Sequence, residues 1–449
     1  IAVFIFFGLA AVIGSQILVL GASDQGVDLF PDSFLLGLLI ITGSILGVFA
    51  LFVITVVMIT IIGDKANIKR AESYDPVVIE NQLVPEKDEN GYWTFTTDRD
   101  LKIMQLTDIH LGGGWLSLKK DSQAINAVAT MIQAEKPDLV IITGDMAFPV
   151  FFKAATFNNK LPAKEIAALM EHLGVYWTVA FGNHDTEAYS YYSREQISDF
   201  YGNSGFKYCL FQKGPDDVDG YGNQVINVKN SKGILTQSLY IFDSHSYTDG
   251  DFLGMMWKYD NIHENQVQWY RDNVNLMNKQ NNERLKELGL PENSDVKSLA
   301  FFHIPLTEQR DAWYEYMANG FKDTENVKYV YGKAGEGKKI IYCGMGEDDL
   351  FETIQELGST KGLFFGHDHD NNFSIYYKGI RMTYGYSIDY LAYSGINKRG
   401  SQRGCTIITV SPDGTFDCKA ENYYQKKYQS QYEKEQVTMQ DVTEASTHL

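Results

Sequence analysis

Cysteine is scarce in this chain. Its 449 residues include only four cysteines, and these lie far apart in the sequence, at Cys209, Cys343, Cys405 and Cys418. No pair has the CxxC spacing, which excludes a disulfide-stapled scaffold and the cysteine-rich type of metal site. We therefore expect free thiols and a reducing compartment.

Positive charge is also in short supply. Lys and Arg together number 39 against 57 Asp and Glu, which gives a net charge of -18. Neutralising a nucleic-acid backbone needs a broad basic surface, so nucleic acid is excluded as a main partner. Hydrophobic residues make up 44% of the chain, which excludes general disorder and supplies a large core.

Long apolar runs are present, and they lie at the start of the chain. Residues 1–21 and 34–62 contain no ionisable side chain, and about twenty apolar residues suffice for a helix to cross a bilayer. We predict two transmembrane helices that form a hairpin over residues 1–64 and contact membrane lipids. A cleaved signal peptide followed by one anchor is the alternative.

The charges beside these runs predict an orientation. Three acids and no base lie in the loop at residues 22–33, whereas three bases lie within residues 65–70. By the positive-inside rule the loop faces outward. The chain is then an integral membrane protein whose remaining residues are cytoplasmic.

The remaining chain divides into three parts. Residues 65–98 are expected to form a linker and a β-hairpin, with VVIENQLV and YWTFTT on either side of a charged turn. Residues 99–420 alternate short aliphatic runs with amphipathic stretches, which is typical of an α/β fold with a parallel or mixed sheet. One further strand is expected at residues 206–211. The polar tail, 421–449, has no periodicity and is expected to be a frayed helix or disordered.

Five of the aliphatic runs end in residues that can bind metals or move protons. These residues are Asp108, His110, Asp145, Asn183, His184, His303, His367 and His369. In open α/β sheets, ligands bind beyond the carboxyl ends of the strands, so side chains from distant positions can meet in one crevice. Carboxylate, amide and imidazole groups without thiolate suit Mn, Fe or Zn.

The number of these ligands fits a pair of ions. Two metals about 3.5 to 4 Å apart can clamp the attacking and leaving oxygens of a displacement at phosphorus. Each motif alone is a weak signal, because a single D-x-H or G-D occurs by chance. Their joint occurrence at successive strand ends predicts a dinuclear metal site.

The same motifs resemble a known family. DIH, GD, GNHD, the isolated His303 and GHDH, in this order over residues 100–415, are similar to the calcineurin-like metallophosphoesterase superfamily. The GHDHDN ending and the FFHIP run resemble the branch of Dcr2-type phosphatases and plant purple acid phosphatase-like proteins. The resemblance implies a two-sheet mixed β-sandwich flanked by helices, with the metal site at one edge.

The resemblance also implies a role for each residue. One metal would bind Asp108, His110 and His369, the other would bind Asn183, His303 and His367, and Asp145 would bridge both. His184 would be no ligand but would stabilise or protonate the leaving oxygen, with Asp185 as its orienting partner.

One position departs from purple acid phosphatases. Their colour comes from a Tyr three residues after the bridging Asp, and here that position is Phe148. An Fe(III)-phenolate site is therefore disfavoured. We expect two divalent ions, with manganese or ferrous iron first and zinc as a further option.

The other histidines are expected to have structural roles. His172 lies in a predicted helix, His263 near a helix start and His448 in the tail. His245 follows a strand-like run, so lining the site is the alternative for it. The apolar runs at 188–193 and 252–257 are expected to pack in the core, and a substrate lip is their alternative.

Together these features predict a membrane-anchored, metal-dependent phosphoesterase. It would hydrolyse a P–O bond by attack of a hydroxide held between two ions, without a covalent intermediate. Two alternatives stay open: a phosphodiesterase or pyrophosphohydrolase acting on a lipid-linked or nucleotide substrate, and a non-catalytic pseudoenzyme that only binds. No motif encodes the identity of the phosphorylated substrate.

Overall fold

A computed structural model describes residues 32–248, 258–292, 295–337, 340–346, 348–393, 395–396 and 403–437. The first predicted transmembrane helix, residues 1–21, lies outside these ranges. The apolar run 252–257 and His448 lie outside them as well. The chain forms two compact units, residues 1–63 and 64–449.

One long helix, α2 (Asp32–Ala71), accounts for the described part of the first unit and runs into the second. Its stretch Gly37–Ala71 is long and apolar enough to cross a membrane, by length and composition. Large side chains along it, such as Ile40, Val48 and Leu51, are exposed. The helix predicted at 34–62 is therefore present, and it continues through the first residues of the predicted linker.

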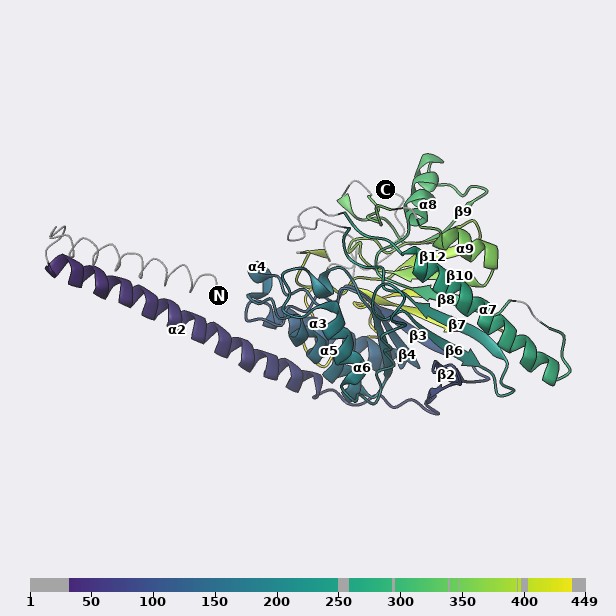
Figure 1. The fold of residues 1–449 in the computed structure, drawn as a ribbon, viewed down its shortest axis with the longest axis horizontal. Coiled ribbons are helices and arrows are strands. Elements are labelled where there is room, and N and C mark those ends of the chain that lie inside the picture. Colours follow the sequence, from purple (N-terminus) through teal and green to yellow (C-terminus); the bar gives the residue numbers. More distant parts are fainter. Residues whose placement is uncertain are drawn as a thin grey trace. The chain divides into compact units, whose positions relative to one another are not determined.

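Two sheets form the second unit (Figure 1). In pairing order, the larger sheet consists of β1 (Glu86–Lys87), β2 (Trp93–Thr96), β6 (Gln224–Lys229), β7 (Leu235–Ile241), β8 (Lys297–Phe301), β10 (Thr360–Phe365), β12 (Ile380–Tyr384), β11 (Ser374–Tyr377) and β9 (Val327–Tyr331). The smaller sheet consists of β14 (Phe416–Asn422), β13 (Gly404–Val410), β3 (Leu101–Leu106), β4 (Leu139–Thr143) and β5 (Tyr176–Ala180).

Both sheets are mixed. In the smaller sheet, β3, β4 and β5 are parallel, while β13 runs antiparallel to β3. In the larger sheet, β7, β8, β10 and β12 are parallel neighbours. The parallel strands of each sheet therefore end at one common edge, which is where the predicted ligands follow them.

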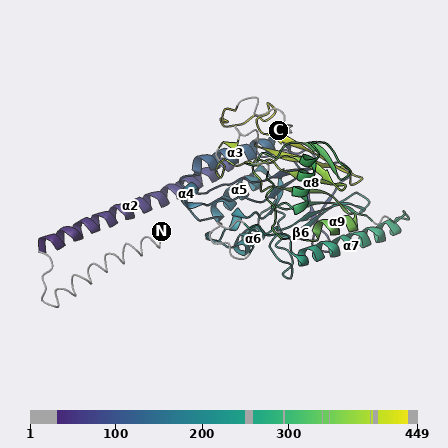
Figure 2. The same cartoon turned by 90° about the horizontal axis from the view of Figure 1, so that it is seen from above.

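Helices cover the outer faces of the sheets. The helices are α3 (Leu118–Glu135), α4 (Phe151–Ala154), α5 (Lys160–Leu173), α6 (Arg194–Asn203), α7 (Glu264–Glu287), α8 (Thr307–Ala318) and α9 (Leu350–Leu357). In Figure 1, and again in the turned view of Figure 2, α3, α5 and α6 gather apart from α7 and α9. The first group packs on the smaller sheet and the second on the larger one.

The core follows the alternation of side chains along the strands. In β3, Ile103 lies in a cluster with Leu239 and Phe301 of the larger sheet, so it fills the space between the sheets. Its neighbour Met104 lies in the cluster that contains residues of α3 and α5, such as Ile125. The predicted α/β fold, a two-sheet sandwich flanked by helices, is confirmed.

Three local predictions are wrong. The run VVIENQLV is no strand, because its backbone and Gln82 bind the carbonyls that end α5; β1 lies instead in the predicted turn. Residues 206–211 form only a single bridge, between Cys209 and Trp177. The tail begins as the end of β14 and is irregular after Asn422, but it packs on the core, because Tyr423 and Tyr428 are buried there.

Candidate metal centre

The predicted ligands lie beyond the ends of five strands. Asp108 and His110 follow β3, Asp145 follows β4, Asn183 follows β5, His303 follows β8, and His367 and His369 follow β10. All seven side chains are buried. The structure brings them together in two groups that share Asp145.

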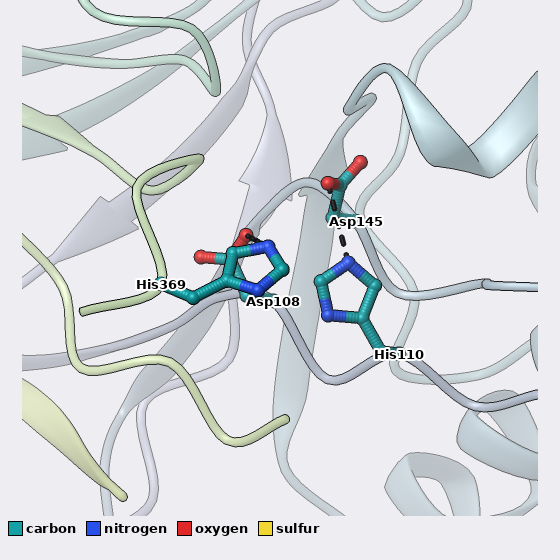
Figure 3. Close-up of side chains that lie close together, drawn as sticks. All are labelled: Asp108, His110, Asp145 and His369. Atoms are coloured by element: carbon teal, nitrogen blue, oxygen red, sulfur yellow. Dashed lines mark hydrogen bonds and ion pairs between the residues drawn. The ribbon is translucent and has the colours of Figure 1, made fainter. Parts of the chain in front are cut away.

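The first group contains Asp108, His110, Asp145 and His369 (Figure 3). Nε2 of His110 lies 3.3 Å from Oδ2 of Asp145, and Nε2 of His369 lies 3.5 Å from Oδ1 of Asp108. One potential ligand atom from each residue lies within 4.8 Å of the others. This spacing is suited to a single ion with two carboxylate and two imidazole ligands.

The second group contains Asp145, His303 and His367, and Asn183 adjoins it. Nε2 of His303 lies 3.2 Å from both Oδ2 of Asp145 and Oδ1 of Asn183. Nδ1 of His367 lies 3.0 Å from the same Asn183 oxygen. Two oxygens and two imidazole nitrogens therefore converge on one point.

A cation fits this second group on chemical grounds. Nδ1 of His303 lies 2.8 Å from the carbonyl oxygen of Thr143, so it carries the ring proton of a neutral imidazole and Nε2 carries the lone pair. That lone pair faces the oxygens of Asp145 and Asn183, which also carry lone pairs. Only a proton or a metal ion makes this arrangement favourable.

The pKa values of His303 and Asp145 reflect the same electrostatic attraction between the two side chains. Burial favours neutral histidine, but the carboxylate of Asp145 outweighs burial and raises the pKa of His303 to about 9. Burial would likewise raise the pKa of Asp145, but the neighbouring His303 and His184 hold that pKa well below its usual range. These neighbouring charges therefore favour the ionised form of the Asp145 carboxylate.

Backbone geometry at the site is strained. Four of the seven candidate ligands have a positive φ: Asp108 (49°), His110 (52°), Asp145 (51°) and His367 (80°). Such values are costly for residues other than glycine and cluster at functional sites. The surrounding backbone holds them, for example through the bond from the His110 amide to the Asp145 carbonyl.

Two glycines explain the short motifs around these ligands. A Cβ at Gly182 would lie 2.2 Å from Oδ1 of Asp145, and a Cβ at Gly144 would lie 2.5 Å from Nδ1 of His303. Either contact would displace a ligand. The GD and GNHD motifs therefore need glycine at these positions because side chains of the site fill the space.

His184 lies beside the two groups without joining either of them in the described structure. Its ring centroid is 5.6 Å from that of His110, and its side chain is 25% exposed. Nδ1 of His184 lies 2.7 Å from Oε1 of Glu187. The charge of Asp145 and the bond to Glu187 outweigh burial and raise the pKa of His184.

The orienting partner of His184 is thus Glu187, and the expectation of Asp185 is wrong. The Asp185 carboxylate instead accepts hydrogen bonds from the backbone amides of Asp145, Ala147 and Gly182. It fixes the loop that carries Asp145. Burial raises the pKa of Asp185 to about 6.

A second residue that the motifs did not identify is Asp389, which follows β12. Its carboxylate lies 3.6 Å from Nδ1 of His110 and 3.4 Å from Nδ1 of His369. It therefore contacts the outer nitrogens of both imidazoles of the first group. Burial would raise the pKa of Asp389, but the two histidines outweigh it and lower the pKa.

Aromatic residues surround the centre. Phe148 lies edge-on to His110 and His184, with centroid distances of 5.2 and 4.8 Å. The ring centroid of Tyr259 lies 4.2 Å from that of His367, and the ring centroid of Tyr393 lies 4.2 Å from that of His369. The hydroxyl of Tyr247 accepts a bond from Asn183 and donates one to Glu187.

The remaining predicted histidines lie apart from the two groups. Nε2 of His172 is 2.8 Å from the carbonyl of Tyr74, a structural contact. His245 does not line the centre but stacks on His263, directly before α7. In the run 188–193, Tyr189 and Tyr192 are half-buried and Tyr191 is exposed.

A fold with two mixed sheets and two adjoining ligand groups at their common edge defines the class of dinuclear metallophosphoesterases. The family model described as calcineurin-like phosphoesterase matches residues 101–371, more than half of the chain. The chain belongs to this family. The resemblance inferred from the motifs is confirmed.

Several relatives are similar in sequence. The chain is 26% identical to "Probable inactive purple acid phosphatase 28" of Arabidopsis thaliana, over 71% of this chain and 77% of that one. It is 30% identical to "Phosphatase DCR2" of Saccharomyces cerevisiae, over 62% of this chain and 46% of that one. Among solved structures, a dimetal phosphatase from Danio rerio covers 73% of this chain and 98% of its own, at 12% identity and a TM-score of 0.45.

Proposed function

We propose that this chain is an active, metal-dependent phosphoesterase anchored to a membrane. The observation that supports this most strongly is the pair of buried ligand groups sharing Asp145. A shared carboxylate is what a dinuclear centre requires. Manganese or ferrous iron is the first choice for both positions, and zinc is the next.

The ligands would hold two divalent ions, which would supply a water of lowered pKa and neutralise charge at phosphorus. The chain's own residues perform the rest. Asp145 presents one carboxylate to both groups, and the amide of His184 fixes its Oδ1 at 2.8 Å. Asp389 orients His110 and His369 from behind, so the first group is organised before an ion binds.

His184 would deliver a proton to the leaving oxygen. Its raised pKa favours the protonated imidazole, and its partial exposure gives substrate access. Glu187 fixes Nδ1 and leaves Nε2 as the donor to the substrate. Tyr247 in turn fixes Glu187 with a bond of 3.0 Å, so the acid has a supported geometry.

A non-catalytic binding protein is the second candidate, and the names of the plant relatives favour it, since they contain the word inactive. That word describes those proteins. In this chain all seven candidate ligands and His184 are present, the candidate ligands gather in two groups that share Asp145, and His184 contacts Glu187. A protein that only binds a phosphorylated ligand would need neither His184 as a proton donor nor Glu187 to orient it.

Turnover on a panel of substrates tests the proposal. Chelator-treated protein would receive Mn²⁺, Fe²⁺, Zn²⁺ or Mg²⁺ separately and be assayed on monoester, diester and pyrophosphate compounds. We expect hydrolysis that depends on Mn²⁺ or Fe²⁺, no hydrolysis by Asp145→Asn, and unchanged hydrolysis by Asp216→Asn, an exposed carboxylate. Metal binding without turnover of any compound would support the binding protein. Hydrolysis of diesters or pyrophosphates alone would support the phosphodiesterase or pyrophosphohydrolase.

The membrane part of the proposal is that α2 spans the bilayer, as the second helix of a hairpin that contacts lipids. The bases within residues 65–70 follow the apolar stretch, which supports a cytoplasmic catalytic unit. A substrate made at or bound to the membrane would then meet the site at high local concentration.

Thiol labelling of intact cells tests this orientation. Cys343, Cys405 and Cys418 are buried, and burial raises the pKa of Cys209 to about 12, so the native thiols react too slowly to report. Asp216→Cys supplies an exposed thiol. We expect a membrane-impermeant maleimide to label it only after detergent opens the cells, with the unmodified protein as control. Labelling in intact cells would contradict the cytoplasmic placement.

A further inference from the structure

Exposed apolar side chains gather near the dinuclear centre, at α4 and in the loop before α3. Phe152 is 88% exposed, Leu116 47% and Phe151 37%. The rings of Phe151 and Phe152 lie edge-on with centroids 5.6 Å apart, and Phe151 stacks on Phe157 at 5.5 Å. Contiguous exposed aromatic side chains of this kind mark a surface that binds a partner.

A glycine loop brings these segments together. A Cβ at Gly114 would overlap the carbonyl oxygen of Ala154 at the end of α4, and a Cβ at Gly113 would lie 2.7 Å from Cβ of Leu161 in α5. The loop therefore packs on both α4 and the first turn of α5, and Leu116 follows it by two residues. Leu116, Phe151 and Phe152 are called the apolar patch below.

The apolar patch borders the dinuclear centre. The ring of Phe148 lies 4.8 Å from that of His184, and Phe151 follows Phe148 by three residues, which span at most about 10 Å. On the other segment, His110 directly precedes the loop by two residues. The patch thus adjoins the side of the centre where His184 lies.

The sequence around the patch is basic. Residues 109–120 contain two lysines and residues 146–164 contain three, and neither segment contains an acid, in a chain whose net charge is -18. Lys153 binds backbone carbonyls, whereas Lys119 and Lys164 are exposed. Apolar side chains surrounded by lysines are complementary to an anionic bilayer, because the rings enter the interfacial layer while the amines meet the lipid phosphates.

The course of the chain favours the same partner. The second unit begins at Asp64, two residues after the uncharged run 34–62 ends. Within this unit, Nδ2 of Asn67 lies 3.3 Å from Oε1 of Glu165, and Lys164 directly precedes Glu165 in α5. The chain therefore enters the second unit beside the helix whose first turn adjoins the patch.

From this geometry and charge we infer that the apolar patch and its lysines bind the surface of an anionic lipid bilayer, with Phe151 and Phe152 in the interfacial layer. The inference rests on the proposed membrane anchor and goes beyond it, because it assigns a lipid-binding surface to the catalytic unit. Docked in this way, the unit presents the His184 side of the centre to the lipid headgroups.

A second copy of the chain is the competing occupant, since aromatic residues are also enriched at protein interfaces. In a symmetric dimer the same patch of both copies meets. The exposed Lys119 and Lys164 of one copy would then approach those of the other, and their like charges would repel. An anionic lipid surface carries no such penalty.

Spin labels on the full chain test the inference. The native thiols react slowly, because three are buried and burial raises the pKa of Cys209 to about 12, so Phe152→Cys supplies one labelling site. The labelled chain would be placed in nanodiscs of phosphatidylcholine with or without phosphatidylserine. Collision rates of the label with oxygen, which concentrates in lipid, and with a water-soluble nickel chelate would then be measured.

We expect phosphatidylserine to raise the oxygen-to-nickel ratio of the Phe152→Cys label several-fold. The label of Asp216→Cys, at an exposed position, should stay in water in both lipids. Adding Lys119→Glu and Lys164→Glu to Phe152→Cys should abolish the effect of phosphatidylserine, while unchanged metal content would show that the chain is folded. Persistence of the effect in this variant would overturn the role of the lysines.

A label in α2 separates failure of this inference from failure of the anchor. Val48→Cys lies in the apolar stretch and is exposed in the native chain. A Val48→Cys label in lipid beside a Phe152→Cys label in water would overturn the inference alone, and both labels in water would overturn the anchor as well. A Phe152→Cys label protected from both reagents, with spin–spin broadening that unlabelled chain relieves, would overturn the inference in favour of a second copy.

Discussion

The carboxylate of Asp389 lies 3.4 Å from Nδ1 of His369, on the side of the imidazole that faces away from Asp108. The same carboxylate lies 3.6 Å from Nδ1 of His110. It accepts bonds from the backbone amides of Leu391, Ala392 and Tyr393. One buried carboxylate therefore contacts two candidate ligands of the first group and is itself held by the main chain.

Replacement of Asp389 should weaken metal binding. In Asp389→Asn the negative charge behind both imidazoles is lost, which makes them weaker ligands and leaves their orientation less fixed. We expect a fall in Mn²⁺ affinity of about 10- to 100-fold, the usual cost of losing such a partner. A metal titration measures it, with Asp216→Asn as the matched control. Native affinity in Asp389→Asn would contradict this role.

Glu187 and Asp185 are expected to affect different properties. Glu187→Gln removes the charge that helps to raise the pKa of His184, so the alkaline limb of the kcat profile should move to lower pH because the acid loses its proton earlier.

Asp185→Asn should lower thermal stability, because three backbone amides lose a carboxylate partner. A shifted pH profile in Asp185→Asn and not in Glu187→Gln would reverse the assignment.

Much of the centre is predictable because its ligands follow strands in short motifs. Asp145 and His303, for example, each follow a strand, and the carboxyl ends of such strands meet at one edge of the fold. The D-x-H and H-x-H spacings add a second side chain at two further strand ends. The spacing of His184 and Glu187 could also have predicted their contact, because residues three apart face one another in a helical turn. A 3₁₀ helix at His184–Thr186 provides that turn.

Other features leave no local signal. Asp389 lies five residues beyond β12, in an irregular segment, and only long-range packing brings it behind His110. The packing of the polar tail depends on Tyr428, whose hydroxyl donates a hydrogen bond of 2.8 Å to Glu135. These two residues lie far apart in the sequence. Such contacts depend on the arrangement of the whole fold and not on periodicity or turn chemistry.

Asp145 and His184 should separate metal binding from proton transfer. Asp145→Asn removes the carboxylate that both groups share, so metal content should fall and the loop around it should be less stable. His184→Ala should keep the metals and lower kcat by about 10²- to 10⁴-fold, the range for a general acid. Elemental analysis beside kinetics tests both. Equal metal depletion in the two variants would show that the roles are wrongly assigned.

Metal removal should make stability depend on pH between about 6.5 and 9. In the metal-free chain the pKa of His303 is raised from 6.5 to about 9, so the folded state binds a proton that the unfolded state releases. This stabilisation is complete below pH 6.5 and is lost as the pH rises through 9. His369, with a pKa raised to about 10 by Asp389 and Asp108 against burial, acts in the same direction.

Thermal unfolding at several pH values measures this effect. We expect the melting temperature of chelator-treated protein to fall from pH 6.5 to pH 9 more steeply than that of Mn²⁺-loaded protein, because bound ions replace the protons. His303→Gln should flatten the metal-free curve. Parallel curves for the loaded and metal-free proteins would mean that these histidines do not bind the ions.

Phe148 predicts a protein without a purple chromophore. It occupies the position, three residues after Asp145, at which a tyrosine would supply a phenolate to ferric iron, and its ring carries no hydroxyl. The neighbouring tyrosines are poor substitutes, because burial raises the pKa of Tyr247, Tyr259 and Tyr393 and so disfavours their phenolates. Iron-loaded protein prepared in air should therefore lack a visible charge-transfer band.

Absorption spectra of the native chain and of single variants test this prediction. If a band is present and persists in Phe148→Leu, another phenolate binds the iron, and loss of the band in Tyr259→Phe or Tyr393→Phe would identify it. Tyr259 contacts His367 of the second group and Tyr393 contacts His369 of the first, so the variant that loses the band also reports which group holds the ferric ion. A colourless protein that turns over phosphoesters with Mn²⁺ or Fe²⁺ would instead agree with two divalent ions, because neither position then needs a phenolate to stabilise a third positive charge.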